Sequence, residues 1–125
     1  MIRYLIDANC VVYALGGESV ALRTRIADCA PGQVVVSAIT YAEVAYGTYV
    51  GKPPPQDVLD AFLRAIPLLA FDEEAARQYA RLPFKRARFD RLLAAHALAL
   101  DAVVVTKNEA NFADVPGLRV ENWTV

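Results

Sequence analysis

The sequence has little of what would set it apart from ordinary globular proteins. Cys10 and Cys29 are its only cysteines, too few and too far apart for a disulfide framework or a zinc knuckle. Lys and Arg number 13 against 14 Asp and Glu, which leaves a net charge of −1. No global basic field therefore attracts DNA. There is no internal repeat and no low-complexity segment. These absences exclude a disulfide-stapled miniprotein and a broad nonspecific coat on DNA.

Long hydrophobic runs are also missing. No apolar stretch approaches the roughly 20 residues that span a bilayer, and the first residues lack the long apolar core of a signal peptide. We therefore expect a cytoplasmic protein with no membrane association and with reduced cysteines. At 125 residues and 56% hydrophobic content, the chain is long enough to form one domain, residues 1–125, with a real core.

What the sequence does contain is a set of short apolar runs that each end at a polar residue: residues 2–6 at Asp7, 34–36 at Ser37 and 103–105 at Thr106. Runs this short and this rich in β-branched residues are typical of strands buried on both faces, hence of a parallel sheet between two layers of helices. With further short strands near residues 67–71 and 118–121, we predict an α/β three-layer sandwich whose mostly parallel sheet has four to five strands.

Periodicity and capping residues predict the helices between these strands. The expected helices cover residues 8–15, a segment after Ser19, and residues 40–50, 58–66, 72–82 and 89–100, with a helical turn at 108–112. Asp101 is expected in the turn after the last long helix, because aspartate tolerates a left-handed backbone better than most residues.

Acidic and amide side chains stand where these helices begin, at Asp7, Glu43, Asp90 and Asn108. Each has a purely structural interpretation as a helix cap, and Thr40 with Glu43 matches a capping box. Helices that follow parallel strands begin at one edge of the sheet, however, which is where ligands bind in such folds. We therefore expect these side chains to converge.

Converging carboxylates in a partly dry cleft would repel one another or take up protons. A hard divalent cation resolves this, because Mg²⁺ and Mn²⁺ prefer oxygen ligands. Such an ion acidifies bound water and neutralises charge developing on a phosphate. The pattern thus favours metal-dependent phosphoryl transfer or phosphodiester hydrolysis, with Asp7, Glu43 and Asp90 at the metal.

Basic residues lie next to Asp90 in the sequence. Arg86 and Arg88, with Lys85 and Arg91, would suit a phosphate backbone held beside the metal, although a solvated basic loop explains them equally well. Lys107 has the same two interpretations. The sole histidine, His96, follows Asp90 by six residues and faces another side of the helix, so we expect a buried helix residue and no ligand.

Tyrosines are concentrated on the early helices, at Tyr13, Tyr41, Tyr46 and Tyr49. Core packing explains some of them. Together with the apolar stripe of residues 58–66, they offer more apolar surface than one small sheet covers. We therefore expect a homodimer or a partner helix on this surface.

The chain resembles PIN-domain proteins of the VapC toxin type over essentially its whole length. The resemblance rests on YLIDAN at residues 4–9, TYAE at 40–43 with Gly47, FDRLLAAHA at 89–97, VVTKN at 104–108 with Phe112, and VPGLRVENW at 115–123. It implies a PIN-like fold and a Mg²⁺- or Mn²⁺-dependent endoribonuclease, toxic unless held by a cognate antitoxin of a type II toxin–antitoxin pair.

The resemblance also implies roles for individual residues. Asp7, Glu43 and Asp90 would be the acidic metal residues, and Asn9 and Thr106 would orient them. Asn108 falls where many PIN domains carry a fourth acid, which leaves a second metal in doubt.

Three functional hypotheses follow. In the first, Asp7, Glu43, Asp90 and Asn108 catalyse RNA hydrolysis while Asn9, Thr106 and two arginines, Arg86 and Arg88, contact or position the substrate. The second is a PIN fold that binds RNA or a partner without cutting. The third is a phospho-acceptor signalling domain, for which Asp72 is the only candidate acceptor.

Overall fold

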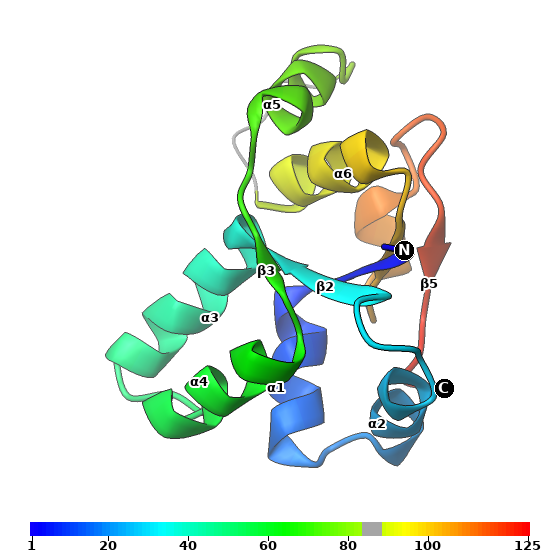
Figure 1. Ribbon diagram of the computed structural model, residues 1–125. Coiled ribbons are helices and arrows are strands. Elements are labelled where there is room, and N and C mark those ends of the chain that lie inside the picture. Colours follow the sequence, from blue (N-terminus) through cyan, green and yellow to red (C-terminus); the bar gives the residue numbers. More distant parts are fainter. Residues whose placement is uncertain (84–88) are drawn as a thin grey trace.

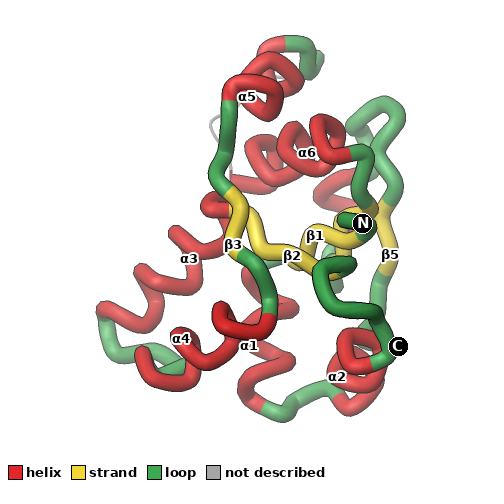
Figure 2. Tube along the Cα trace, viewed as in Figure 1, coloured by secondary structure: helices red, strands yellow, loops and turns green. Residues whose placement is uncertain are grey.

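The computed structural model describes residues 1–83 and 89–125. At its centre is a parallel sheet of five strands in the order β3-β2-β1-β4-β5 (Figures 1 and 2). The strands are β1 (Tyr4–Ile6), β2 (Val34–Ser37), β3 (Leu68–Leu69), β4 (Val103–Val105) and β5 (Val120–Glu121). The predicted α/β class is confirmed, and every pairing in the sheet is parallel.

Helices connect consecutive strands and cover both faces of the sheet. They are α1 (Ala8–Gly16), α2 (Val20–Ala27), α3 (Ala38–Tyr49), α4 (Gln56–Ala65), α5 (Glu73–Ala80) and α6 (Phe89–Leu100), with the 3₁₀ turn η1 (Glu109–Phe112). Helices α5 and α6 lie on one side of the sheet, and α1, α3 and α4 on the other (Figure 1). No helix in the described ranges is long and apolar enough to cross a membrane.

Successive side chains along each strand point to opposite faces of the sheet and so belong to two separate hydrophobic cores. Leu5, Val35 and Val104 belong to the core under α6, whereas the adjacent residues Ile6 and Val105 belong to the core under α1. This period of two is the geometry of a strand. Both faces are buried, so the strands are apolar on both sides, as the uninterrupted valine runs predict.

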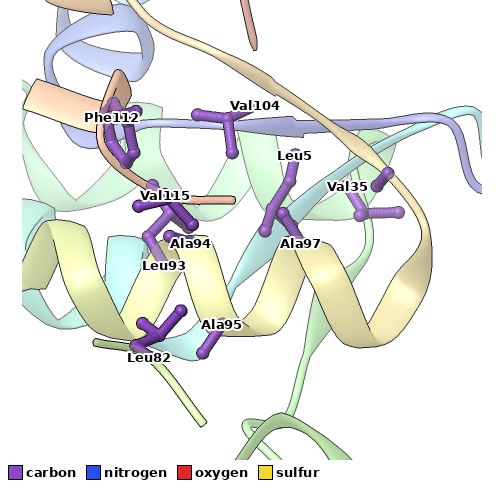
Figure 3. Close-up of a cluster of buried hydrophobic side chains, with 11 residues drawn as sticks. Leu5, Val35, Leu82, Leu93, Ala94, Ala95, Ala97, Val104, Phe112 and Val115 are labelled. Carbon is purple, nitrogen blue, oxygen red and sulfur yellow. The ribbon is translucent and has the colours of Figure 1, made fainter. Parts of the chain in front are cut away.

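Helix α6 packs on the sheet through small residues. Ala94, Ala95 and Ala97 are fully buried, and Figure 3 shows Leu5 and Val104 directed from the sheet toward this helix. Side chains this short let the helix approach the sheet closely, because little volume separates the two backbones. The helix therefore holds its first turn, which carries Asp90, against the sheet.

The C-terminal segment is fastened to the sheet by Trp123, which is fully buried. Its indole N–H donates to Oε1 of Glu121 at 2.9 Å, and its ring lies edge-on to that of Tyr4 with centroids 4.7 Å apart. The guanidinium of Arg25 on α2 lies 4.7 Å from the indole centroid. Strand β5 is thereby joined both to β1 and to α2.

Most local expectations are confirmed, but the expected start of α3 is wrong. Asp101 adopts the left-handed backbone, with φ of 53°. Helix α3, expected to open at Thr40, begins at Ala38 and is capped by the Ser37 hydroxyl, which accepts from the amide of Ile39 at 3.0 Å. Both Ser37 and Thr40 are good caps, and the serine lies at the end of the strand.

The predicted surplus of apolar surface is confirmed on α3, where Tyr46 is 67% exposed and Tyr49 is 89% exposed. The homodimer expected from that surplus stays a prediction.

Candidate functional site

Asp7 occupies the carboxyl edge of the sheet, directly after β1. Its backbone amide donates to the carbonyl of Val105 at 3.0 Å, which locks it beside the end of β4. Its Oδ1 accepts from the amide of Cys10 at 2.9 Å, so Asp7 is the N-cap of α1. The capping interpretation is therefore correct for this residue. A cap uses one carboxylate oxygen and leaves the other available to a ligand.

Glu43 reaches the same edge from the middle of α3. Because α3 begins at Ala38, Glu43 is six residues past the Ser37 cap and cannot be the N3 member of a capping box. The Thr40 hydroxyl instead donates to the carbonyl of Ile6 at 3.2 Å. This bond fastens the first turns of α3 to the residue just before Asp7. The capping explanation of Glu43 is thus wrong.

Asp90 and Asn108 also lack the capping roles that would explain them structurally. Helix α6 begins at Phe89, which places Asp90 in its first turn and not at the cap position. Asn108 precedes η1, but its side chain makes no capping hydrogen bond. The backbone N–H of Asn108 donates to the Thr106 hydroxyl at 3.0 Å. Thr106 is fully buried, so this hydroxyl orients the backbone of Asn108.

Asp90 and Asp7 are both close enough to Glu43 to act on it electrostatically. Burial raises the pKa of Glu43 from 4.5 to about 6, and the negative charges of Asp90 and then Asp7 add to that rise. A carboxylate surrounded by like charges is stabilised by protonation or by a cation. Two acids distant in the sequence therefore lie close enough to Glu43 to disfavour its charged form.

The donor set at this position fits a hard divalent ion. Carboxylate oxygens such as those of Asp7, Glu43 and Asp90 are the ligand type that Mg²⁺ and Mn²⁺ prefer. Within residues 1–83 and 89–125, no three His, Cys, Asp or Glu side chains are grouped tightly enough to enclose an ion by themselves. Mg²⁺ does not require such a cage, since it keeps several waters and binds through one or two carboxylates.

Cys10 does not extend this donor set. Burial, followed by the charge and hydrogen bond of Asp7, raises the pKa of its thiol far above the usual range. A protonated thiol is a poor metal ligand, because the thiolate is the ligating form. Cys10 and Cys29 are both free thiols.

Asn9 is brought to the site together with Glu43. The two residues line a hollow of about 350 Å³ between α1 and α3 that extends to Lys52. Asn9 is exposed, so its side chain is accessible to a ligand entering from solvent.

The basic residues adjacent to Asp90 divide into two groups. Arg86 and Arg88 lie outside the described residues. Arg91 is 8% exposed and forms an ion pair with Asp114, so it is part of the packing of α6 against the segment after η1. The interpretation of Arg91 as a phosphate contact is wrong.

His96 is buried as expected, yet it makes a contact that the sequence did not suggest. Its Nδ1 lies 2.7 Å from the Ser37 hydroxyl, and its ring packs edge-on against Phe71 at 5.5 Å. Burial lowers the pKa of His96. Neutral histidine thus links the middle of α6 to the cap of α3. In the sequence, the only feature that pointed toward this contact was the position of Ser37 at the end of a predicted strand.

Comparison with known proteins agrees with this architecture. The profile of the PIN domain matches residues 4–118 of the chain. The chain belongs to the PIN domain family. The matched residues include Asp7, Glu43, Asp90 and Asn108.

This PIN domain is similar over nearly its whole length to proteins named as VapC ribonucleases. It is 27% identical to the tRNA(fMet)-specific endonuclease VapC of Shigella flexneri, with 99% of this chain and 100% of that protein covered. It is 29% identical to ribonuclease VapC2 of Rickettsia felis, with 96% and 97% covered.

Solved structures show the same fold. VapBC2 from Rickettsia felis, bound to a DNA fragment from its promoter, superposes with a TM-score of 0.84 at 27% identity, covering 98% of this chain and 99% of that one. DNA-bound VapBC from Salmonella typhimurium gives 0.82 at 26% identity, with the same coverage.

Proposed function

We propose that this PIN domain is a Mg²⁺- or Mn²⁺-dependent endoribonuclease that hydrolyses RNA phosphodiester bonds, and that it is the toxin of a toxin–antitoxin pair. The observation that carries the proposal is that the negative charges of Asp90 and Asp7 both act on Glu43 at the carboxyl edge of the sheet. Similarity to VapC ribonucleases and to VapBC complexes supports the substrate class and the partner.

Each residue has a role that its position supports. Asp7 and Asp90 would hold the principal cation, and Asn108 would assist through its amide oxygen. Glu43, with a pKa of about 6, would orient the attacking water by accepting a hydrogen bond from it, or would hold a second ion. Asn9 would contact the RNA from the exposed side, and Thr106 holds Asn108 in place.

A bound Mg²⁺ or Mn²⁺ supplies Lewis acidity toward the phosphate and lowers the pKa of a coordinated water. Arg86 and Arg88, outside the described residues, are proposed to position the RNA strand. The antitoxin would be a protein that covers this site and blocks RNA entry.

The direct test is cleavage of RNA by purified protein freed of any partner. EDTA should stop cleavage and added Mg²⁺ or Mn²⁺ should restore it. Asp90→Asn should abolish cleavage, because it removes a charged ligand while keeping the side-chain shape. Asp57→Asn, which removes an exposed carboxylate from α4, is the matched control and should cleave like the wild type. Undiminished cleavage by Asp90→Asn or in EDTA would reject the proposal.

A second candidate is a PIN fold that binds RNA or a partner without cutting it. The feature in its favour is Asn108, which supplies a neutral amide where many PIN domains have an acid. RNA affinity without cleavage at any concentration of Mg²⁺ or Mn²⁺ would select this function over the first.

The phospho-acceptor hypothesis has little support. Asp72 follows the edge strand β3 and caps α5 through a 3.0 Å bond from the amide of Ala75. Its role as the N-cap of α5 is sufficient to explain an aspartate at this position. Modification of the protein by acetyl phosphate would revive this hypothesis.

A further inference from the structure

A second hollow lies beyond the end of β4. It measures about 410 Å³ and is bounded by Tyr13 of α1, by Lys107 and by the segment from Glu18 into α2. Its volume is within the range of small-molecule sites. None of the acidic residues proposed at the metal lines it, so it is a separate compartment.

Lys107 connects this hollow to the site. It stands two residues after Val105, whose carbonyl accepts the amide of Asp7 at 3.0 Å. The backbone amide of Cys10 donates to Oδ1 of Asp7 at 2.9 Å, and the charges of Asp7 and Lys107 both act on the buried Cys10 thiol. Lys107 and the carboxylate proposed to bind the metal therefore both lie near Cys10.

The ammonium of Lys107 is held in place without being neutralised. It lies 4.7 Å from the centroid of the Tyr13 ring and donates to the Tyr13 hydroxyl at 3.3 Å. No ion pair in the described part of the chain includes Lys107. A preorganised cation loses less side-chain entropy when it binds an anion than a freely rotating lysine does.

We propose that Lys107 and Tyr13 form a phosphate subsite for RNA beside the acidic site, and that the adjoining hollow receives the neighbouring nucleoside. The proposal rests on the ribonuclease function proposed above and names the path of its substrate. Tyr13 stands six residues past Asp7 on α1, about 9 Å along the helix axis. An RNA strand leaving the acidic site would meet the lysine before the hollow.

Glu18 allows a test in which the opposite change in RNA affinity is expected. It lines the same hollow and is exposed. Its negative charge repels a phosphate at Lys107, more strongly at low salt. If RNA occupies the hollow, removing the Lys107 charge weakens binding and removing the Glu18 charge strengthens it. A purely structural role for the Lys107–Tyr13 contact predicts neither change in RNA affinity.

The experiment measures the binding of a short fluorescein-labelled single-stranded RNA across a salt series. Asp90→Asn serves as the parent, so that the RNA stays intact. Adding Lys107→Gln should weaken binding about tenfold at low salt, the size of one charge-assisted hydrogen bond. It should also make the negative slope of log K against log salt concentration shallower by about 0.7. Lys107→Arg should retain affinity, and Glu18→Gln should increase it several-fold.

Arg64→Gln is the matched control, since it removes one exposed positive charge from the last turn of α4, just before β3 at the opposite edge of the sheet. Equal effects of Lys107→Gln and Arg64→Gln would overturn the proposal, as would unchanged affinity in Glu18→Gln. If the parent itself binds no RNA, the ribonuclease proposal fails as well. In the otherwise wild-type protein, Lys107→Gln should raise KM and leave kcat unchanged.

Discussion

The Thr40 hydroxyl of α3 donates a 3.2 Å hydrogen bond to the carbonyl of Ile6, the last residue of β1. Both groups are buried. Asp7 follows Ile6 directly, and Glu43 lies three residues past Thr40 on the same helix. A single bond thus sets the spacing between the elements that carry two of the three proposed metal ligands.

Removing this hydroxyl should cost stability and loosen the site together. Thr40→Val keeps the shape of the side chain but removes the hydroxyl that donates to the buried Ile6 carbonyl, which typically costs about 0.5–1.5 kcal/mol of unfolding free energy. Urea denaturation measures that loss. The affinity for Mn²⁺ should fall in parallel, because Glu43 is no longer held relative to Asp7.

Thr40→Ser is the control for that variant, since it keeps the donor and removes only a methyl group. It should retain most of the cation affinity. Equal cation affinity in the valine and serine variants would show that the bond does not position the acids.

Glu43 should make stability depend on pH in a defined direction. Its pKa in the folded protein is about 6 against an ordinary value of 4.5, so between these values the folded state binds more protons than the unfolded state. The unfolding free energy then falls as pH rises through this window. Glu43→Gln removes this decrease in unfolding free energy. Between pH 4.5 and 7, the unfolding free energy of the variant should therefore rise relative to that of the wild type, by at most about 2 kcal/mol and by less where solvent screens the charges.

Bound Mg²⁺ should offset the loss of unfolding free energy that ionised Glu43 causes. A cation between the carboxylates replaces their repulsion by attraction, so saturating Mg²⁺ should stabilise the wild type more at pH 7 than at pH 5, and more than it stabilises Glu43→Gln. Thermal unfolding at several pH values measures both effects. A difference between variant and wild type that stays flat from pH 4.5 to 7 would contradict the electrostatic account of the site.

The sequence was sufficient for the fold because its strands are buried on both faces. The valine runs at 34–36 and 103–105 had no alternative as amphipathic helices, and their polar ends located Ser37 and Thr106 at one edge of a sheet. Asp7 could be placed at that edge because it directly follows a strand of the parallel sheet. The same argument does not cover Asp90, because α6 follows α5 and not a strand. The start of α3 was misplaced, since local capping chemistry does not distinguish Ser37 from Thr40.

The contacts between distant residues could not be predicted. Ser37 and His96 are 59 residues apart, and Lys107 and Tyr13 are 94 apart. No periodicity or local motif links such pairs, because their meeting depends on how α6 and α1 pack against the sheet. The raised pKa of Glu43 is of the same kind, since it arises from burial and from Asp90 and Asp7 after folding.

Anomalous diffraction from crystals soaked in Mn²⁺ tests the central claim most directly, because it locates the ion without reference to activity. We predict an anomalous peak bounded by the carboxylates of Asp7, Glu43 and Asp90, lost in Asp90→Asn crystals. Mn²⁺ bound elsewhere, or the same peak persisting in Asp90→Asn, would contradict the account.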